Sequence, residues 1–419
     1  MRLPRSRRLD GIALITTQLH RPDGVTSSHG RSYRWRMSIG DRIYELRTER
    51  TPKLTQTALA EKAGVSVDLI QKLEQGQRQT ASLKYLTKIA RALDTSLSDL
   101  VSRPGRLVGE VESDSGLLQL RQALTPLIPP ELTEAAETDT RAVLNGAWSI
   151  YYGSSDFDAL AGILPGLLTD SQRHPRVQAE AYRLAACLAS RIGVEDLAYL
   201  AGGKALEAAA RSDDPYLLTT ARATVAWLYL NQGRAEEGLA FAAGLIEALE
   251  PRLGRAPVKE VAVWGNLVVT GATAASRAGK PDQAAEFLRL AAAAASVTGE
   301  RVDYYTSFGI GQVAMQTVDA AIVAENYTGA LNAAKAMPQE SSLRPVSIAR
   351  HLEDVALAQT RLRRDAAAVD TLARIERMAP KWIAYEPLVR SIVTELVQRE
   401  SRVKTPQLRS LARRLNIAA

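Results

Sequence analysis

The chain has 419 residues, which is enough for two or more domains with separate cores. Hydrophobic residues make up 46% and charged residues 24%, as in ordinary globular proteins, whereas aromatic residues reach only 5%. Alanine runs such as 291–295 are frequent, and β-branched runs bounded by turns are scarce. Because alanine is the strongest helix former, the composition predicts an all-α protein.

Several function classes find no support in the sequence. The single cysteine, Cys187, excludes an intramolecular disulfide framework and fits a reducing cytoplasm. The four histidines are isolated, so we expect no metal and no cofactor. No apolar run reaches the roughly 18 residues of a membrane span, and the apolar patch 12–15 is too short for a signal peptide. Residues 117–419 hold no catalytic constellation, so we expect an intracellular protein that is not an enzyme.

The formal net charge of +7 is unevenly distributed along the chain. Residues 1–37 carry +6 and residues 38–103 carry +3, while the remainder carries −2. Positive charge gathered at one end is what a nucleic-acid-binding region requires, and the alternative is a solvated basic tail.

Composition shifts divide the chain into four segments. Residues 1–36 are rich in Arg, Gly, Ser and Pro and predict a disordered basic extension, either upstream of a true start at Met37 or acting as a phosphate-gripping arm. Residues 37–101 show helical spacing of apolar residues and predict a compact unit. Residues 102–116 predict a linker, and residues 117–419 predict a long series of helices.

The stretch LTQTALAEKAGVSVDLIQKLEQG, from Leu54 to Gly76, predicts two short helices joined by a tight turn. Thr55 and Ser66 are good N-caps for the two helices. Gly64 can adopt the positive φ that ends the first helix, and Ile70 and Leu73 can pack the second helix against the first. The spacing therefore predicts a helix-turn-helix.

Together with IGDRIYELRTER before it and ASLKYLTKIARAL after it, this unit resembles the Cro/C1-type, or XRE-family, helix-turn-helix domain, a lambda-repressor-like fold. The RTPKL connection is two residues longer than is usual in that family. The resemblance implies a structural ion pair between Arg47 and Glu74. It also implies DNA contacts by Gln56, Ser66, Val67, Asp68, Gln71, Lys72, Gln75, Arg78, Gln79 and Thr80.

Within this set the expected roles differ. Gln56 and Ser66 would contact phosphates, and the residues from Gln75 to Thr80 would hold the backbone on the far side. Asp68 would accept from cytosine N4, Val67 would contact a thymine methyl and Lys72 would donate to guanine. The alternative for each polar residue is an ordinary solvated side chain, and for Asp68 a carboxylate that only favours its helix terminus. One domain covers half a site, so the family implies a homodimer on an inverted-repeat operator in double-stranded DNA.

From residue 117 onward, related turns recur at Gly193, Gly233, Gly279, Asn326 and Arg364, separated by 40, 46, 47 and 38 residues. Each turn separates a helix from a second helix with an Ala/Leu stripe. AWLYLNQGRAEEGLAFA, from Ala226 to Ala242, most clearly resembles a tetratricopeptide repeat. We therefore expect a tetratricopeptide-like α-solenoid of stacked helical hairpins.

Aromatic and amide residues are placed on the expected first helices of these hairpins, including Tyr304 and Tyr305. In tetratricopeptide solenoids the first helices line the concave face, where such residues can hold a ligand. The four candidate effector contacts are Asn145, Trp148, Trp264 and Asn266. The alternative for the aromatic residues is a role in the core between repeats.

This domain order resembles the RRNPP class of peptide-responsive regulators and the long helix-turn-helix regulators of actinobacteria. The resemblance implies a bacterial, cytoplasmic and nucleoid-associated transcription regulator that senses a peptide or small-molecule effector. In the alternative, the helical repeats are a constitutive dimerisation and protein-docking scaffold without a small ligand.

Overall fold

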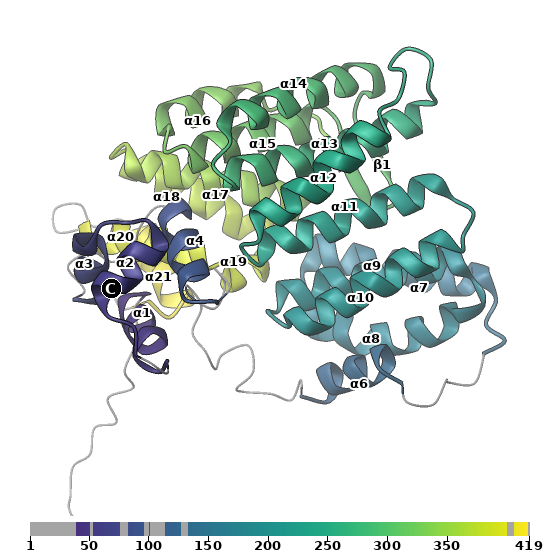
Figure 1. Cartoon of the computed structure of the whole chain (residues 1–419), viewed down its shortest axis with the longest axis horizontal. Coiled ribbons are helices and arrows are strands. Elements are labelled where there is room, and N and C mark those ends of the chain that lie inside the picture. Colours follow the sequence, from purple (N-terminus) through teal and green to yellow (C-terminus); the bar gives the residue numbers. More distant parts are fainter. Residues whose placement is uncertain are drawn as a thin grey trace, which may run out of the picture. The chain divides into compact units, whose positions relative to one another are not determined.

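The computed structural model describes residues 39–50, 53–75, 83–95, 100, 114–126, 133–399 and 406–417. These residues form helices, apart from one short β-hairpin, so the all-α prediction is confirmed (Figure 1). The expected basic extension 1–36 and most of the expected linker lie outside the described residues. Helix α6 begins at Asp114, within the segment predicted to be linker.

The helix-turn-helix unit contains four short helices, counted over its described residues, around a small core. They are α1 (Ile39–Thr48), α2 (Gln56–Ala63), α3 (Val67–Glu74) and α4 (Leu83–Ala92). Apolar residues buried in this core include Ile43, Leu59, Ile70, Leu73, Leu86, Ile89 and Leu93. Leu46, Leu54 and Val65 are half-buried against the same core.

The turn between α2 and α3 forms as the sequence predicts. Thr55 Oγ1 accepts a hydrogen bond from the backbone N–H of Ala58 at 3.1 Å, which satisfies one of the free donors at the start of α2. Gly64 ends α2 with φ 60° and ψ 47°, a left-handed conformation that costs glycine little. Ser66 Oγ accepts from the N–H of Leu69 at 3.2 Å and so caps α3.

The helical region begins with a small group of helices. They are α6 (Asp114–Leu124), α7 (Glu137–Ser149), the π-helix η1 (Ile150–Ser154), α8 (Phe157–Asp170) and the 3-10 turn η2 (Ser171–Arg173). Leu120, Trp148 and Leu164 are buried in the core that these helices share with the first hairpin.

Five helical hairpins follow, at the positions that the recurring turns predict. They are α9 (Pro175–Arg191) with α10 (Glu195–Ala210), α11 (Pro215–Asn231) with α12 (Ala235–Ala248), α13 (Val258–Arg277) with α14 (Pro281–Thr298), α15 (Ile310–Val323) with α16 (Tyr327–Ala333), and α17 (Pro345–Arg361) with α18 (Asp365–Met378). The 3-10 turn η3 (Ala334–Ala336) lies between α16 and α17, and the last described elements are α19 (Trp382–Tyr385), α20 (Pro387–Arg399) and α21 (Pro406–Arg414).

All five turns place one residue at positive φ. Gly193, Gly233 and Gly279 have φ values of 72–77°, as their identity predicts. In the last two turns the left-handed residues are Glu325 and Arg363, one position before the residues that mark the turns in the sequence. The backbone geometry of the turn is therefore repeated although the glycine is not.

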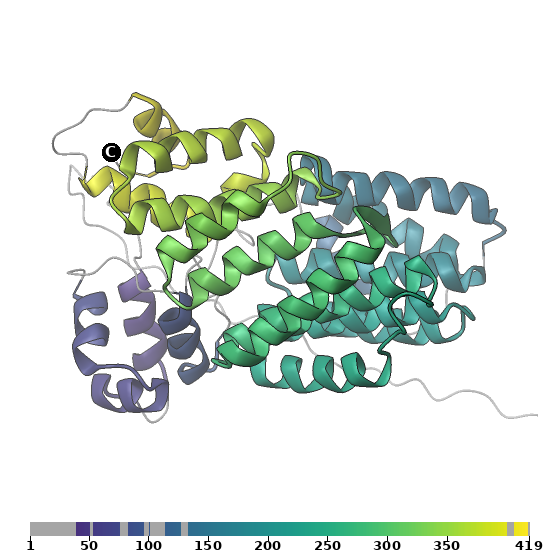
Figure 2. The ribbon, with the colours of Figure 1, turned by 90° about the horizontal axis from the view of Figure 1, so that it is seen from above.

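The first helices of the hairpins form a continuous layer. Helix α9 packs against α11, α11 against α13, α13 against α15, and α15 against α17, while each second helix covers its own first helix (Figures 1 and 2). Alanine-rich faces allow this close approach, with Ala185, Ala226, Ala274 and Ala356 almost wholly buried. Any ligand reaching this layer would meet side chains from several hairpins at once.

A β-hairpin interrupts the helices between α14 and α15. Strands β1 (Arg301–Asp303) and β2 (Thr306–Phe308) are antiparallel, with Val302 opposite Ser307. The expectation that Tyr304 and Tyr305 lie on a first helix is wrong, because they form the turn between these strands. Both have positive φ, 48° and 60°, the backbone required at the two central positions of a tight hairpin turn.

The described residues contain neither a membrane-spanning helix nor a cluster of metal ligands. None of their helices is both long enough and apolar enough to cross a membrane. Within the same residues, no group of three or more His, Cys, Asp or Glu side chains is arranged to hold a metal ion.

Candidate functional site

Helix α3 has one buried face and one exposed face. Leu69, Ile70 and Leu73 point into the core and are at most 5% exposed. The exposed face carries Asp68, Gln71, Lys72 and Gln75, the last as the C-cap of the helix. This is the arrangement of a recognition helix, in which the outer face contacts base edges in the major groove.

Two of the expected base-reading residues are paired with each other. Lys72 Nζ lies 2.8 Å from Asp68 Oδ2, one helical turn away, with side chains 48% and 67% exposed. In the absence of DNA, each charge is therefore partly neutralised by its neighbour. The aspartate near the start of α3 thus serves both the helix terminus and the lysine.

The other expected contacts are placed differently. Val67 is half-buried against the domain core, so less of its side chain faces outward than the sequence implied. Gln56 Nε2 donates to Glu74 Oε2 at 2.7 Å, which leaves its second amide hydrogen for a phosphate. Arg78, Gln79 and Thr80 lie outside the described residues.

The expected ion pair between Arg47 and Glu74 is confirmed. Arg47 Nε and Nη2 donate to the two carboxylate oxygens of Glu74, both at 2.8 Å, in the bidentate geometry that arginine favours. Arg47 Nη1 also donates to the Leu54 carbonyl at 2.8 Å. The hydrogen bond to Glu74 raises the pKa of Arg47 above its usual value. This network joins α1, α3 and the start of α2.

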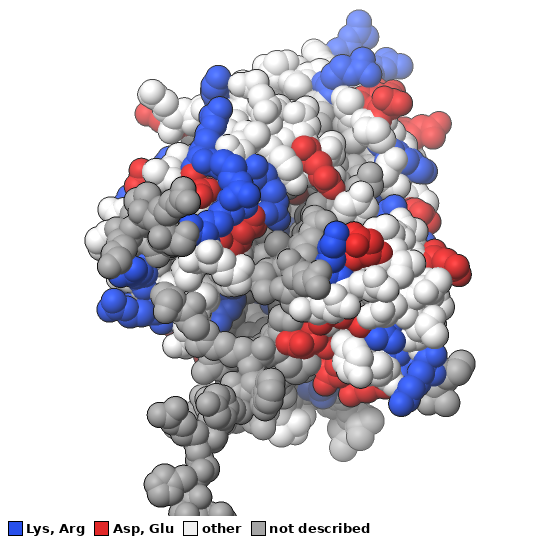
Figure 3. Space-filling view, turned by 90° about the vertical axis from the view of Figure 1, so that its left-hand side faces the viewer, with Lys and Arg blue, Asp and Glu red and all other residues white. Residues whose placement is uncertain are grey.

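Surface charge is mixed. Among the coloured residues of the face shown in Figure 3, groups of Lys and Arg side chains alternate with Asp and Glu side chains.

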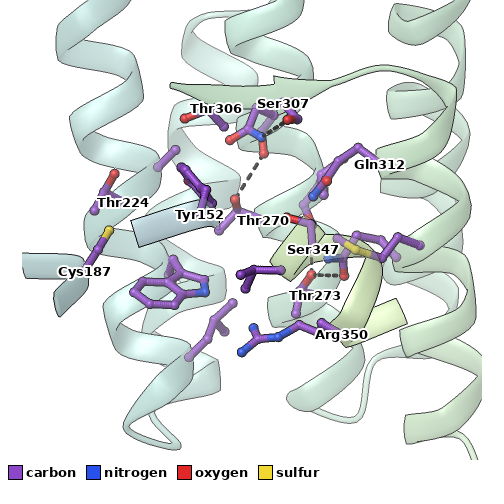
Figure 4. Close-up of a pocket in the computed structure, with 18 of the residues that line it drawn as sticks. Tyr152, Cys187, Thr224, Thr270, Thr273, Thr306, Ser307, Gln312, Ser347 and Arg350 are labelled. Atoms are coloured by element: carbon purple, nitrogen blue, oxygen red, sulfur yellow. Dashed lines mark hydrogen bonds between the residues drawn. The ribbon is translucent and has the colours of Figure 1, made fainter. Parts of the chain in front are cut away.

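The helical region contains an interior cavity lined by the first helices of all five hairpins. The volume of the cavity is about 220 Å³, far more than one water molecule requires. In Figure 4, Tyr152 and Thr224 lie on one side of it, Gln312, Ser347 and Arg350 on the other, and Thr306 and Ser307 at one end.

Two of the four expected effector contacts line this cavity. Trp148 is 2% exposed and its Nε1 has no hydrogen-bond partner, while Asn266 Nδ2 donates to the Ser307 carbonyl at 3.4 Å. Asn145 is exposed and accepts a hydrogen bond from the hydroxyl of Tyr305. Trp264 is buried in the core and donates to the Ile246 carbonyl at 3.0 Å. It does not line the cavity.

The tip of the β-hairpin is held by several polar contacts. Arg183 donates to the Tyr304 carbonyl at 3.1 Å and to Thr306 Oγ1 at 3.2 Å. The Tyr304 hydroxyl donates to the Asp214 carboxylate, and Tyr305 stacks on Trp148 with ring centroids 5.2 Å apart. Two bulky residues at positive φ are costly, and these contacts supply the compensation.

Sequence reasoning missed the charged lining of the cavity. Four arginines line it, Arg183, Arg191, Arg277 and Arg350, together with Asp319 and Asp354. The available signal was a charged residue on an otherwise apolar first helix, as in AYRLAACLAS around Arg183. A buried charge is expensive, so its position in an apolar run predicts a polar interior site.

Two adjacent carboxyl groups, Glu353 and Asp354, are buried on α17. Burial raises the pKa of each well above its usual value, and neighbouring carboxylates, Glu386 for Glu353 and Asp319 for Asp354, raise it further. Glu353 Oε1 has no hydrogen-bond partner. Protonation of both carboxyl groups is therefore more favourable in the folded protein than in the unfolded chain.

These raised pKa values predict a stability that falls as pH rises. At a pH above the ordinary carboxyl pKa, the folded state binds more protons than the unfolded state. The contribution of these two groups to the free energy of unfolding is therefore complete at low pH and is lost as the pH rises through their raised pKa values. Glu353→Gln should flatten this fall, by up to roughly 1.4 kcal/mol per pH unit in that window. Urea unfolding at pH 5, 6, 7 and 8 would measure it, with exposed Glu207→Gln as control. Parallel curves for Glu353→Gln and the wild type would contradict the expectation.

Comparisons with known proteins bear on the first of these two sites. No curated protein and no solved structure matches the chain. Residues 43–100 match the helix-turn-helix family. The matched segment begins within α1 and includes α2, α3 and α4. This match, with the caps and exposed α3 described above, supports a DNA-binding regulator of the Cro/C1, or XRE, helix-turn-helix type.

Proposed function

We propose that the protein is a sequence-specific transcription regulator that binds an inverted-repeat operator as a homodimer. The supporting observation is α3, whose apolar face is buried and whose polar face is free to enter a major groove. The α-solenoid would be tetratricopeptide-like and would carry an effector site in its interior cavity. We place such a protein in the cytoplasm, at the nucleoid.

The ion pair on α3 gives this proposal a discriminating mechanism. When Lys72 donates to guanine, Asp68 loses its partner and must find a donor such as cytosine N4. On a wrong sequence, Asp68 either keeps Lys72 or is left near phosphates that repel it. The pair therefore penalises non-specific binding, and so contributes to specificity more than to affinity.

Replacing Lys72 should test base reading. Lys72→Ala is expected to cost about 1–3 kcal/mol of binding free energy at the specific site and to relax the base preference there. Affinity for random DNA should change much less, because the charge of Lys72 is partly neutralised by Asp68 in the free protein. Fluorescence anisotropy on both DNAs would measure this, with exposed Lys280→Ala as control.

Two results bear on the role of the pair. Asp68→Asn should strengthen binding to random DNA while weakening discrimination, because a repulsive charge is removed. An equal loss of affinity on specific and random DNA for Lys72→Ala would show that Lys72 only contacts phosphate.

The effector site is proposed on the first helices because one cavity there joins all five hairpins. A ligand bound by several hairpins would stabilise one curvature of the solenoid over others, and would thereby change how two DNA-binding domains are presented. Operator affinity measured with and without a metabolite extract would test this coupling. Unchanged affinity and unchanged melting temperature would leave the solenoid without an effector.

A further inference from the structure

Two guanidinium groups in the cavity have unused hydrogen-bond donors. Arg277, on α13, has its Nε buried without a partner, and its ion pair with Asp319 is 3.7 Å long, beyond hydrogen-bond distance. Arg350, on α17, makes no hydrogen bond to the described residues, and its ion pair with Glu386 is 3.9 Å long. Figure 4 shows Arg350 extending from its helix toward the cavity interior.

Arginines outnumber carboxylates among the residues that line the cavity. Four arginines line the cavity against two aspartates, and burial raises the pKa of Asp354, which favours its neutral form. Arg191 is already paired with Glu386 at 2.8 Å. Arg183 has no carboxylate within 4.0 Å among the described residues, although the charge of Glu180 interacts with it. An anion in the cavity would meet the unsatisfied donors of Arg277 and Arg350.

Threonine hydroxyls of α11 and α13 also line the cavity and offer acceptors. The hydroxyl of Thr220 donates to the Tyr216 carbonyl at 2.8 Å, that of Thr224 to the Thr220 carbonyl at 3.1 Å, and that of Thr270 to the Asn266 carbonyl at 3.1 Å. A hydroxyl has only one hydrogen to donate, so these oxygens present lone pairs to the cavity. They suit a ligand that carries hydroxyl or N–H donors.

We propose that the cavity binds a small organic anion that also carries hydroxyl groups, with its phosphate or carboxylate held by Arg277 and Arg350. Arginine presents its donors in a fork that matches both anionic groups. The hydroxyl groups of the ligand donate to the threonines of α11 and α13. This inference rests on the proposed effector role of the cavity and specifies its ligand class.

Calorimetric titration of the full-length protein, without DNA, tests the ligand class. The probes are glucose 6-phosphate, gluconate, glucose and inorganic phosphate, at matched ionic strength. One or both of the first two should bind, and glucose and phosphate should bind at least about tenfold more weakly, since each has half of the required groups. Which of the first two binds more tightly distinguishes a phosphate from a carboxylate ligand.

Variants locate the binding site. Arg350→Gln and Arg277→Gln should each weaken binding about 10- to 100-fold, because a charge-assisted hydrogen bond is lost. Arg350→Lys keeps the charge without the fork and should fall between Arg350→Gln and the wild type. The matched control is Arg289→Gln, an exposed position on α14 outside the cavity. The melting temperature of each variant without ligand shows whether the variant folds. If Arg350→Gln does not fold, the binding measured for Arg350→Lys tests the role of Arg350.

Three results would overturn the proposal: no binding of either hydroxylated anion, binding of glucose as tight as that of the better-bound anion, or unchanged binding by both arginine variants. Because DNA is absent, any of these results would leave the DNA-binding role intact. If the wild-type protein binds the anion but binds no operator DNA, the regulator role would be overturned instead.

Discussion

Glu74→Ala is expected to destabilise the helix-turn-helix domain by about 3–5 kcal/mol, a large part of the stability of a domain of this size. The Glu74 side chain is only 3% exposed and accepts three hydrogen bonds, two from Arg47 and one from Gln56. Its removal leaves the guanidinium of Arg47, 11% exposed, without a counter-ion. The cost is that of an unpaired buried charge rather than that of a surface salt bridge.

Hydrogen exchange of the α1–α3 amides, followed by mass spectrometry, would localise this loss within the full-length protein. Glu61→Ala, an exposed position on α2, provides the control and should change exchange little. Replacing Arg47 and Glu74 together by leucines should recover part of the loss, because neither charge is then left unpaired. Exchange in Glu74→Ala equal to that in Glu61→Ala would mean that the ion pair is not structural.

Gly40→Ala is the second substitution with a large expected effect. A Cβ at this position, in the first turn of α1, would lie 1.8 Å from the Leu73 carbonyl oxygen and 2.5 Å from its carbon. These are backbone atoms near the end of α3, so no side chain can rotate away. We expect α1 to be displaced at a cost above the usual 1–3 kcal/mol of overpacking, with loss of DNA binding.

A matched glycine provides the comparison. At Gly203, exposed on α10, an added Cβ meets nothing within 4 Å, so Gly203→Ala should stabilise its helix by about 0.5–1 kcal/mol. Thermal unfolding and operator binding of both variants would separate the two cases. If Gly40→Ala behaves like Gly203→Ala, α1 does not pack on α3 as closely as described.

The helix-turn-helix could be predicted almost residue by residue because its determinants are local. The caps at Thr55 and Ser66, the left-handed Gly64 and the buried Ile70 all depend on neighbours within a few positions. The exceptions are tertiary. The packing of Val67 against the core and the hydrogen bond from Gln56 to Glu74 depend on segments that meet only in the folded domain.

In the helical region, the hairpins were predictable and the cavity was not. The five turns have a local signature, whereas the cavity needs side chains from α7 to α17, which lie far apart in the sequence. The β-hairpin was missed because its tyrosine turn lacks the usual Asn-Gly signal. Trp148 and Trp264 could not be told apart by sequence, although one lines the cavity and the other donates to a core carbonyl.

The central claim, sequence-specific recognition by α3, is tested most directly by selecting bound DNA from a random pool with the full-length protein and sequencing it. The account predicts one enriched motif with two-fold symmetry and half-sites about one helical turn apart. The same selection with Lys72→Ala should relax the preference at one symmetric pair of positions. Recovery of no enriched motif, or of the same motif with unchanged preference for Lys72→Ala, would contradict it.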